Sequence, residues 1–123
     1  MVVDRSLVVF AAVCGALAVV LGAFAAHGAG PQVKGLLTTG AHYQLVHALL
    51  GLVCAVWPVR TQLASIAGWL ASLGGLIFGL ALACIGLLHL PLMGVVAPIG
   101  GVLMIVGWLA LGFAAFRSHS VNT

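Results

Sequence analysis

Four long apolar runs, separated by short breaks, take up most of the chain and limit what it can fold into. The 123 residues are 64% hydrophobic and only 4% charged, whereas a soluble domain carries about 25% charged residues. A chain this apolar needs lipid as its solvent, and a helix that crosses the hydrocarbon layer takes roughly 20 apolar residues. We therefore predict an all-α fold, a four-helix transmembrane bundle, in which residues 1–123 form a single membrane domain.

The breaks between the runs predict where the helices lie. We expect spans at about residues 7–26, 41–57, 63–88 and 93–116. The glycine-rich segment 28–40 is typical of a connection, and Pro58 with Arg60 is expected to end the second span. A tight turn is expected after the third span, and Pro98 is suited to the first turn of the fourth.

The few basic residues indicate how the bundle is oriented. An even number of spans puts both termini on one side, together with Arg5, Arg60 and Arg117, and leaves Lys34 on the other. Cytoplasmic segments are enriched in Lys and Arg, so we predict cytoplasmic N and C termini in a bacterial inner membrane. Scattered singly, these residues form no basic patch for nucleic acid, and membrane lipid is the expected partner.

The three tryptophans fall in the cytoplasmic half of this arrangement. Each of these side chains, Trp57, Trp69 and Trp108, is an apolar indole ring with one polar N–H. Such residues are enriched at membrane interfaces, but these lie far enough from the helix ends to serve equally as packing residues.

Small residues recur at helical spacing in the first and third runs. Lipid supplies no hydrophobic drive for helix pairing, so close backbone contact and interhelical hydrogen bonds must hold the helices together. The stripes either pack the helices of one chain or face another protomer or a partner subunit. The residues that we expect at helix contacts are Gly15, Gly22, Ala67, Ala71, Gly75, Gly79, Gly100 and Gly101.

Polar residues gather at the non-cytoplasmic end of the predicted bundle. His27 closes the first span, and Tyr43, Gln44 and His47 lie in the first two turns of the second. Polar groups at membrane depth usually pair and face the bundle interior, so these four are the candidate ligand-binding or polar cluster. Three interpretations stay open: a structural hydrogen-bond network, a transition-metal site that includes His27 and His47, or a site for a headgroup, quinone or other small ligand. No cofactor is assigned, and the metal is unknown.

The sequence offers few groups for catalysis. Its one acidic residue, Asp4, lies outside the predicted spans, although ion-coupled transport commonly uses a carboxylate inside the membrane. No Ser-His-Asp set, zincin helix or phosphate loop is present. We therefore expect a non-enzymatic accessory or interaction protein, working as a homo-oligomer or as a subunit of a larger membrane complex. The alternative is a protein that binds a small ligand, a lipid or quinone, or a metal, with transport as one form of it, at the histidine-rich outward end.

Several segments resemble the small membrane proteins grouped as domain of unknown function 423, the group of transmembrane protein 256. Residues 22–28, GAFAAHG, resemble its GAFGAHG signature, and residues 39–48, TGAHYQLVHA, its TGxxYQxxHALALL segment. Residues 97–101, APIGG, followed by Gly107-Trp108, are similar to its TPxGG and GW elements. The resemblance implies a four-span membrane protein with no assigned activity, and the four candidate residues match the family's pattern by position.

The chain departs from that pattern at three places. Ala25 replaces a glycine, and Ala97 replaces a threonine able to cap the fourth helix. Residues 78–82 lack the serines and the tyrosine of the family's SGSLYLL segment. If those positions contribute to a site shared by the family, this chain has lost part of it.

Overall fold

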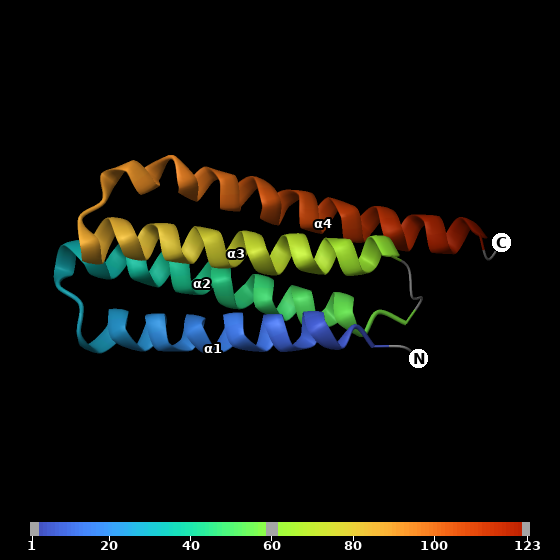
Figure 1. Ribbon diagram of the computed structural model, residues 1–123, viewed down its shortest axis with the longest axis horizontal. Helices are drawn as coiled ribbons and strands as arrows, with labels where there is room; N and C mark the ends of the chain where they lie inside the picture. The colour runs from blue at the N-terminus through green and yellow to red at the C-terminus, as the bar shows by residue number, and fades with distance from the viewer. Residues whose placement is uncertain (1–2, 59–61, 122–123) are drawn as a thin grey trace.

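Helices make up the whole of the regular structure in the described residues, 3–58 and 62–121, of the computed structural model. In chain order they are α1 (Arg5–His27), α2 (Pro31–Ala55), α3 (Gln62–Leu88), the short 3-10 helix η1 (Pro91–Gly94) and α4 (Val96–Val121). Figure 1 shows that the long helices run side by side in alternating directions, so both termini lie at the same end of the molecule. The predicted all-α, four-helix fold is confirmed.

Three segments of the described chain are long and apolar enough to cross a membrane: Arg5–His27, Gln62–Leu88 and Pro91–Arg117. The other long helix, α2, has 25 residues but carries more polar side chains. It lies alongside α1 and α3 over most of its length (Figure 1). A crossing by α2, and with it the four-span topology, stays a prediction.

The second helix begins much earlier than expected, at Pro31 rather than near residue 41. Gly30 is its N-cap, with φ −69° and ψ 165°, and Pro31 occupies the first turn. Proline is favoured there because its fixed φ suits a helix and the first N–H groups have no partner in any case. Gly30 and Pro31, predicted from the sequence to lie in a connection, therefore start a helix. The link from α1 to α2 is consequently short.

The other ends lie closer to the predictions. The third helix matches within one residue, whereas the fourth begins at Val96 instead of residue 93, after η1, and has Pro98 in its first turn as predicted. The expected turn after α3 is present, and His89 in it adopts a positive φ of 53°. Arg60, one of the residues that supported the orientation, lies outside the described residues.

Asp4 starts the first helix. Its carboxylate accepts a hydrogen bond from the Leu7 backbone N–H at 3.1 Å, as an N-cap residue does. The Asp4 backbone N–H donates to the carbonyl of Ala55 at 3.1 Å. The side chain of Asp4 thus begins α1, and its backbone N–H holds this helix beside the end of α2.

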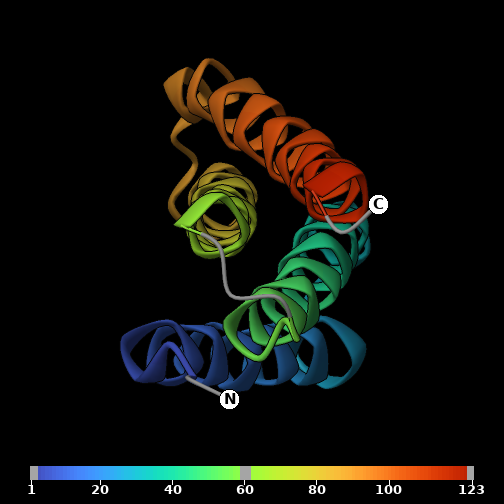
Figure 2. The same ribbon diagram turned by 90° about the vertical axis from the view of Figure 1, so that its right-hand side faces the viewer.

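The four helices pack in sequence order. Helix α1 packs mainly against α2, α2 against α3, and α3 against α4. Seen along the bundle, α1 and α4 lie on opposite sides of the molecule (Figure 2). Helices α1 and α3 touch much less, and one such contact, toward the end that carries the termini, brings the Phe10 and Trp69 rings within 5.1 Å. Because α1 has one main neighbour, most of its surface is left to lipid or to a partner.

Small residues make the contacts between neighbouring helices. A Cβ added at Gly100 would lie 2.7 Å from the carbonyl oxygen of Gly74, so the backbones of α3 and α4 touch there. Gly101 is the exception among the predicted contact residues, because a Cβ at that position would meet nothing within 4 Å. The other predicted residues face neighbouring helices of the same chain: Gly15, Gly22, Ala67, Ala71, Gly75 and Gly79.

Candidate functional site

His47 is the centre of a polar and aromatic cluster in the middle of the molecule. Its side chain is 5% exposed. The indole N–H of Trp108, on α4, donates to His47 Nε2 at 3.0 Å, and His47 Nδ1 lies 2.6 Å from the carbonyl oxygen of Tyr43. An indole nitrogen can only donate. The neutral imidazole therefore carries its hydrogen on Nδ1 and donates it to the Tyr43 carbonyl.

Ring contacts around His47 join three helices. The Tyr43 ring stacks on His47 with centroids 6.2 Å apart, and meets Phe78 of α3 edge-on at 5.3 Å. The His47 ring meets Trp108 edge-on at 6.0 Å. Edge-on and offset stacked rings attract beyond the area they bury, so the cluster ties α2 to both α3 and α4.

Sequence reasoning left Trp108 out of the site, because its position fitted an interfacial belt equally well. The signal that points to it is chemical: Trp108 is 50% exposed, but an indole N–H at membrane depth still needs an acceptor because polar groups there usually pair. In this sequence the possible side-chain acceptors inside the spans are few. The pairing with His47 joins residues 61 positions apart and depends on how α2 and α4 pack.

Gln44 belongs to a different contact. Its amide nitrogen donates to the backbone carbonyl of Cys14, on α1, at 2.9 Å. The side chain is 2% exposed, and its buried carbonyl oxygen Oε1 has no hydrogen-bond partner among the described residues. This oxygen lies against Gly79 of α3, where any added Cβ would collide with it. Gln44 therefore joins α1 to α2 and leaves one acceptor unused.

His27 does not join the other three predicted residues. It is exposed at the last residue of α1 and, within the described parts of the chain, makes no hydrogen bond or ring contact. His47 lies near the middle of α2, not in its first two turns, because that helix starts at Pro31. The structure brings Tyr43 and His47 together, turns Gln44 toward α1, and places His27 at an end of the molecule. A binding role for the four remains a prediction.

The described residues offer no ready metal centre. No three His, Cys, Asp or Glu side chains within residues 3–58 and 62–117 come together in a way that could hold an ion. Both ring nitrogens of His47 are already engaged, one with Tyr43 and one with Trp108. Metal binding by His47 would require one of these bonds to break.

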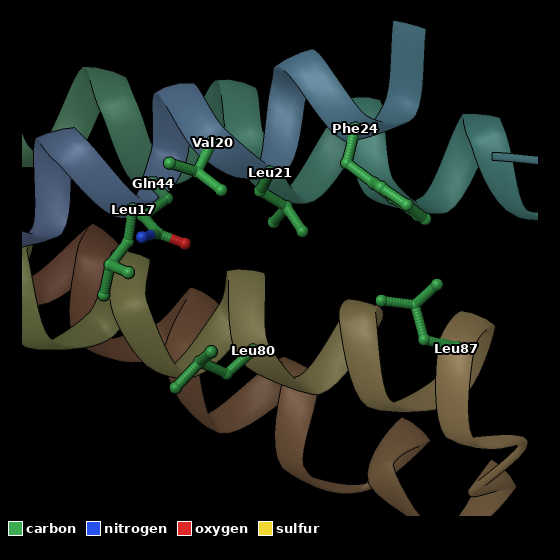
Figure 3. A pocket seen from close by; sticks show the side chains of 7 residues that line it. All are labelled: Leu17, Val20, Leu21, Phe24, Gln44, Leu80 and Leu87. Atoms are coloured by element: carbon green, nitrogen blue, oxygen red, sulfur yellow. The ribbon is translucent and has the colours of Figure 1, made fainter. Parts of the chain in front are cut away.

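A groove of about 290 Å³ runs between α1 and α3, with α2 behind it. Apolar side chains from α1 and α3 face each other across it, and the Gln44 amide lies between them (Figure 3). The residues that line the groove are Leu17, Val20, Leu21, Phe24, Gln44, Leu80 and Leu87.

Long apolar helices with a few internally paired polar groups define a small helical membrane protein. Residues 21–101 match the family model described as a protein of unknown function, DUF423, so the chain belongs to this family. It is 35% identical over 120 residues to the UPF0382 inner membrane protein YgdD of Escherichia coli, covering 93% of this chain and 92% of the relative. These findings confirm the family resemblance and agree with the expected location in a bacterial inner membrane.

Relatives in other bacteria carry similarly general names. A UPF0382 membrane protein of Haemophilus influenzae is 33% identical over 117 residues, covering 89% of this chain and 93% of its own length. The UPF0382 membrane protein SH2409 of Staphylococcus haemolyticus is 31% identical over 115 residues, covering 89% of this chain and 94% of its own length. No solved structure is significantly similar.

Proposed function

We propose that this protein is a non-enzymatic accessory or interaction protein of the membrane, which works as a homo-oligomer or as a small subunit of a larger complex. One observation carries the proposal. The buried polar side chains Gln44 and His47 bond to helices of the same chain, whereas the outward faces of α1 and α4 are long and apolar.

The polar chemistry inside the bundle supports this choice over catalysis or coupled transport. The sequence's one carboxylate, Asp4, caps α1 and so lies at a helix end. A proton relay through His47 would have to break its bonds to Trp108 and to the Tyr43 carbonyl. The internal groups therefore serve best as fixed links between helices.

The outer helices present the surface on which such a protein would act. Helix α1 is bound mainly to α2, and α4 mainly to α3, so each has a broad outward face. These faces carry large exposed apolar side chains such as Val19 and Leu109, which are 61% and 69% exposed. In a membrane such a face meets either lipid or another helix, and shape decides between the two.

Native size in mild detergent and in lipid nanodiscs tests the proposal. The expected result is a homo-oligomer or a stoichiometric complex with a co-purifying protein. Val19→Trp on α1 and Leu109→Trp on α4 enlarge the two outward faces, and at least one of them is expected to lower the native mass while the helix content stays the same. A wild-type protein that is a lone monomer in both media contradicts the proposal.

Ligand binding is the second candidate function, and the groove beside Gln44 favours it. A metal-binding form of it has less support, because His47 uses both ring nitrogens and His27 lies apart. Elemental analysis of the purified wild type, alongside the His27→Ala and His47→Ala variants, tests that form. A stoichiometric metal that is lost in both variants would establish it, and its absence would rule it out.

A further inference from the structure

The groove between α1 and α3 combines an apolar lining with one unused acceptor. Helices α1 and α3 meet near the terminal end through Phe10 and Trp69. Farther along, side chains of the two helices face each other across an open gap (Figure 3). Every lining side chain except Gln44 is apolar. The groove therefore offers hydrocarbon contact together with a single polar group.

That polar group is held in a fixed orientation. The amide nitrogen of Gln44 is anchored to the Cys14 carbonyl at 2.9 Å, so the amide cannot turn over without losing this bond. Its oxygen is consequently directed to the space between α1 and α3 (Figure 3). Buried acceptors are nearly always satisfied in native proteins. An oxygen without a partner at the base of a groove thus indicates a donor that comes from outside the chain.

The depth of Gln44 limits what that donor is. Gln44 lies near the middle of Pro31–Ala55, which is more than about 15 Å from either end of the helix at 1.5 Å per residue. In the predicted four-span topology, phospholipid headgroups stay at the interface and do not reach this depth. No charged side chain lines the groove, and an unpaired charge inside the hydrocarbon is costly. The donor is therefore neutral and belongs to a molecule that dissolves in the membrane interior.

We infer that the groove binds a lipid-soluble quinol, with one ring hydroxyl donating to Gln44 Oε1 and the ring lying among Leu17, Leu80 and their neighbours. A quinol combines a neutral O–H donor with an apolar body and resides within the hydrocarbon layer. The volume of about 290 Å³ lies at the lower limit for ligand pockets, roughly 300 Å³, and suits one substituted ring. Its chain leaves the groove past Phe24 and Leu87.

The oxidation state of the ligand gives this site its specificity. A quinol carries hydroxyl hydrogens, whereas the oxidised quinone has only carbonyl oxygens and cannot donate. The Gln44 oxygen accepts a hydrogen bond from the quinol, but it cannot form one with the quinone. The reduced form is therefore expected to bind at least ten times more tightly than the oxidised form. This site is independent of the role proposed for the outward faces of α1 and α4.

Thermal unfolding in phosphatidylcholine nanodiscs tests the inference, since a ligand that binds only the folded state raises the midpoint as its concentration rises. The probes, titrated without oxygen, are a benzoquinol with one isoprenoid unit, the matching benzoquinone and the matching dimethyl ether. We expect the quinol to raise the midpoint saturably. The quinone and the ether should need at least tenfold higher concentration for the same shift.

Three variants locate the binding. Leu80→Trp places a larger ring in the groove at a side chain that is 50% exposed, and should abolish the shift caused by the quinol. Leu49→Trp makes the same change at a 55% exposed position outside the groove and should preserve the shift. Gln44→Leu should raise the half-maximal quinol concentration at least tenfold. If Gln44→Leu does not fold, the two tryptophan variants decide.

Two results would overturn the inference. Equal shifts with quinol, quinone and ether in the wild type would show that the groove accepts only hydrocarbon, as a phospholipid chain provides. A preference for quinol that persists in Leu80→Trp would place the binding elsewhere.

Discussion

The buried polar side chains show how a protein in lipid uses very few hydrogen-bonding groups. His47 has a partner at each ring nitrogen, and Gln44 has one for its amide nitrogen. Ser72 is 1% exposed, its hydroxyl has no partner in the described part of the chain, and the oxygen lies close to Gly51. Among the described residues, the polar groups that join helices are thus paired, whereas the buried oxygens of Gln44 and Ser72 are not, and that of Gln44 lies beside a groove.

The bond between Trp108 and His47 is a direct polar link between α2 and α4, and its removal should be measurable. Trp108→Phe keeps an aromatic ring but deletes the donor, leaving Nε2 of His47 without a partner. We expect a loss of about 1 kcal/mol in the free energy of unfolding, near the upper part of the range for interhelical bonds in membranes. Trp69→Phe, which keeps its ring beside Phe10, is the matched control. Equal stability of the two variants would show that the bond contributes nothing.

At the scale of helices, close approach between backbones is what holds α3 to α4. Adjacent glycines provide a matched test of it. A Cβ at Gly100 would lie 2.7 Å from both the Gly74 oxygen and the Phe78 nitrogen, whereas a Cβ at Gly101 meets open space. Gly100→Ala should lower the free energy of unfolding by about 2 kcal/mol, as overpacking does. Gly101→Ala should be neutral or slightly stabilising, because alanine is the better helix former. If Gly101→Ala lowered the free energy of unfolding as much as Gly100→Ala, this packing would be contradicted.

The turn after α3 holds a residue in a conformation that suits glycine. His89 has φ 53°, and the N–H of the next residue, Leu90, donates to the Cys84 carbonyl at 3.3 Å. A left-handed conformation costs roughly 1–2 kcal/mol for a residue with a Cβ. His89→Gly should therefore raise the free energy of unfolding by about 1 kcal/mol, whereas His89→Ala should not. Thermal unfolding of the three proteins compares them directly, and a glycine variant less stable than the alanine variant would refute the expectation.

Sequence patterns predicted the helices better than their contacts. The third helix was placed within one residue because its apolar run is long and ends at a histidine and a proline. The start of α2 was missed because Gly30 and Pro31 fit a turn and a helix start equally well. That error moved His47 to an end of the molecule and grouped it with His27. The partners of His47 and Gln44 lie on other helices, and pairings of this kind depend on packing that no local pattern contains.

At the scale of the whole molecule, the predicted topology requires α2 to cross the membrane with its neighbours. Helix α2 is less apolar than the other three, but its central polar residues Gln44 and His47 are buried against α1 and α4. A helix whose polar groups are covered by other helices needs less apolar surface of its own. The four long helices alternate in direction and put both termini at one end, as a four-span topology requires (Figure 1).

Accessibility of single cysteines tests this topology most directly. In a background with Cys14, Cys54 and Cys84 replaced by alanine, a membrane-impermeant maleimide is applied to intact spheroplasts and to inverted vesicles. Separate proteins carry Arg5→Cys, Lys34→Cys and Arg117→Cys. We predict that the cysteines at positions 5 and 117 react only in inverted vesicles, and that at position 34 only in spheroplasts. Reaction of positions 34 and 117 from the same side would contradict the four crossings on which the account rests.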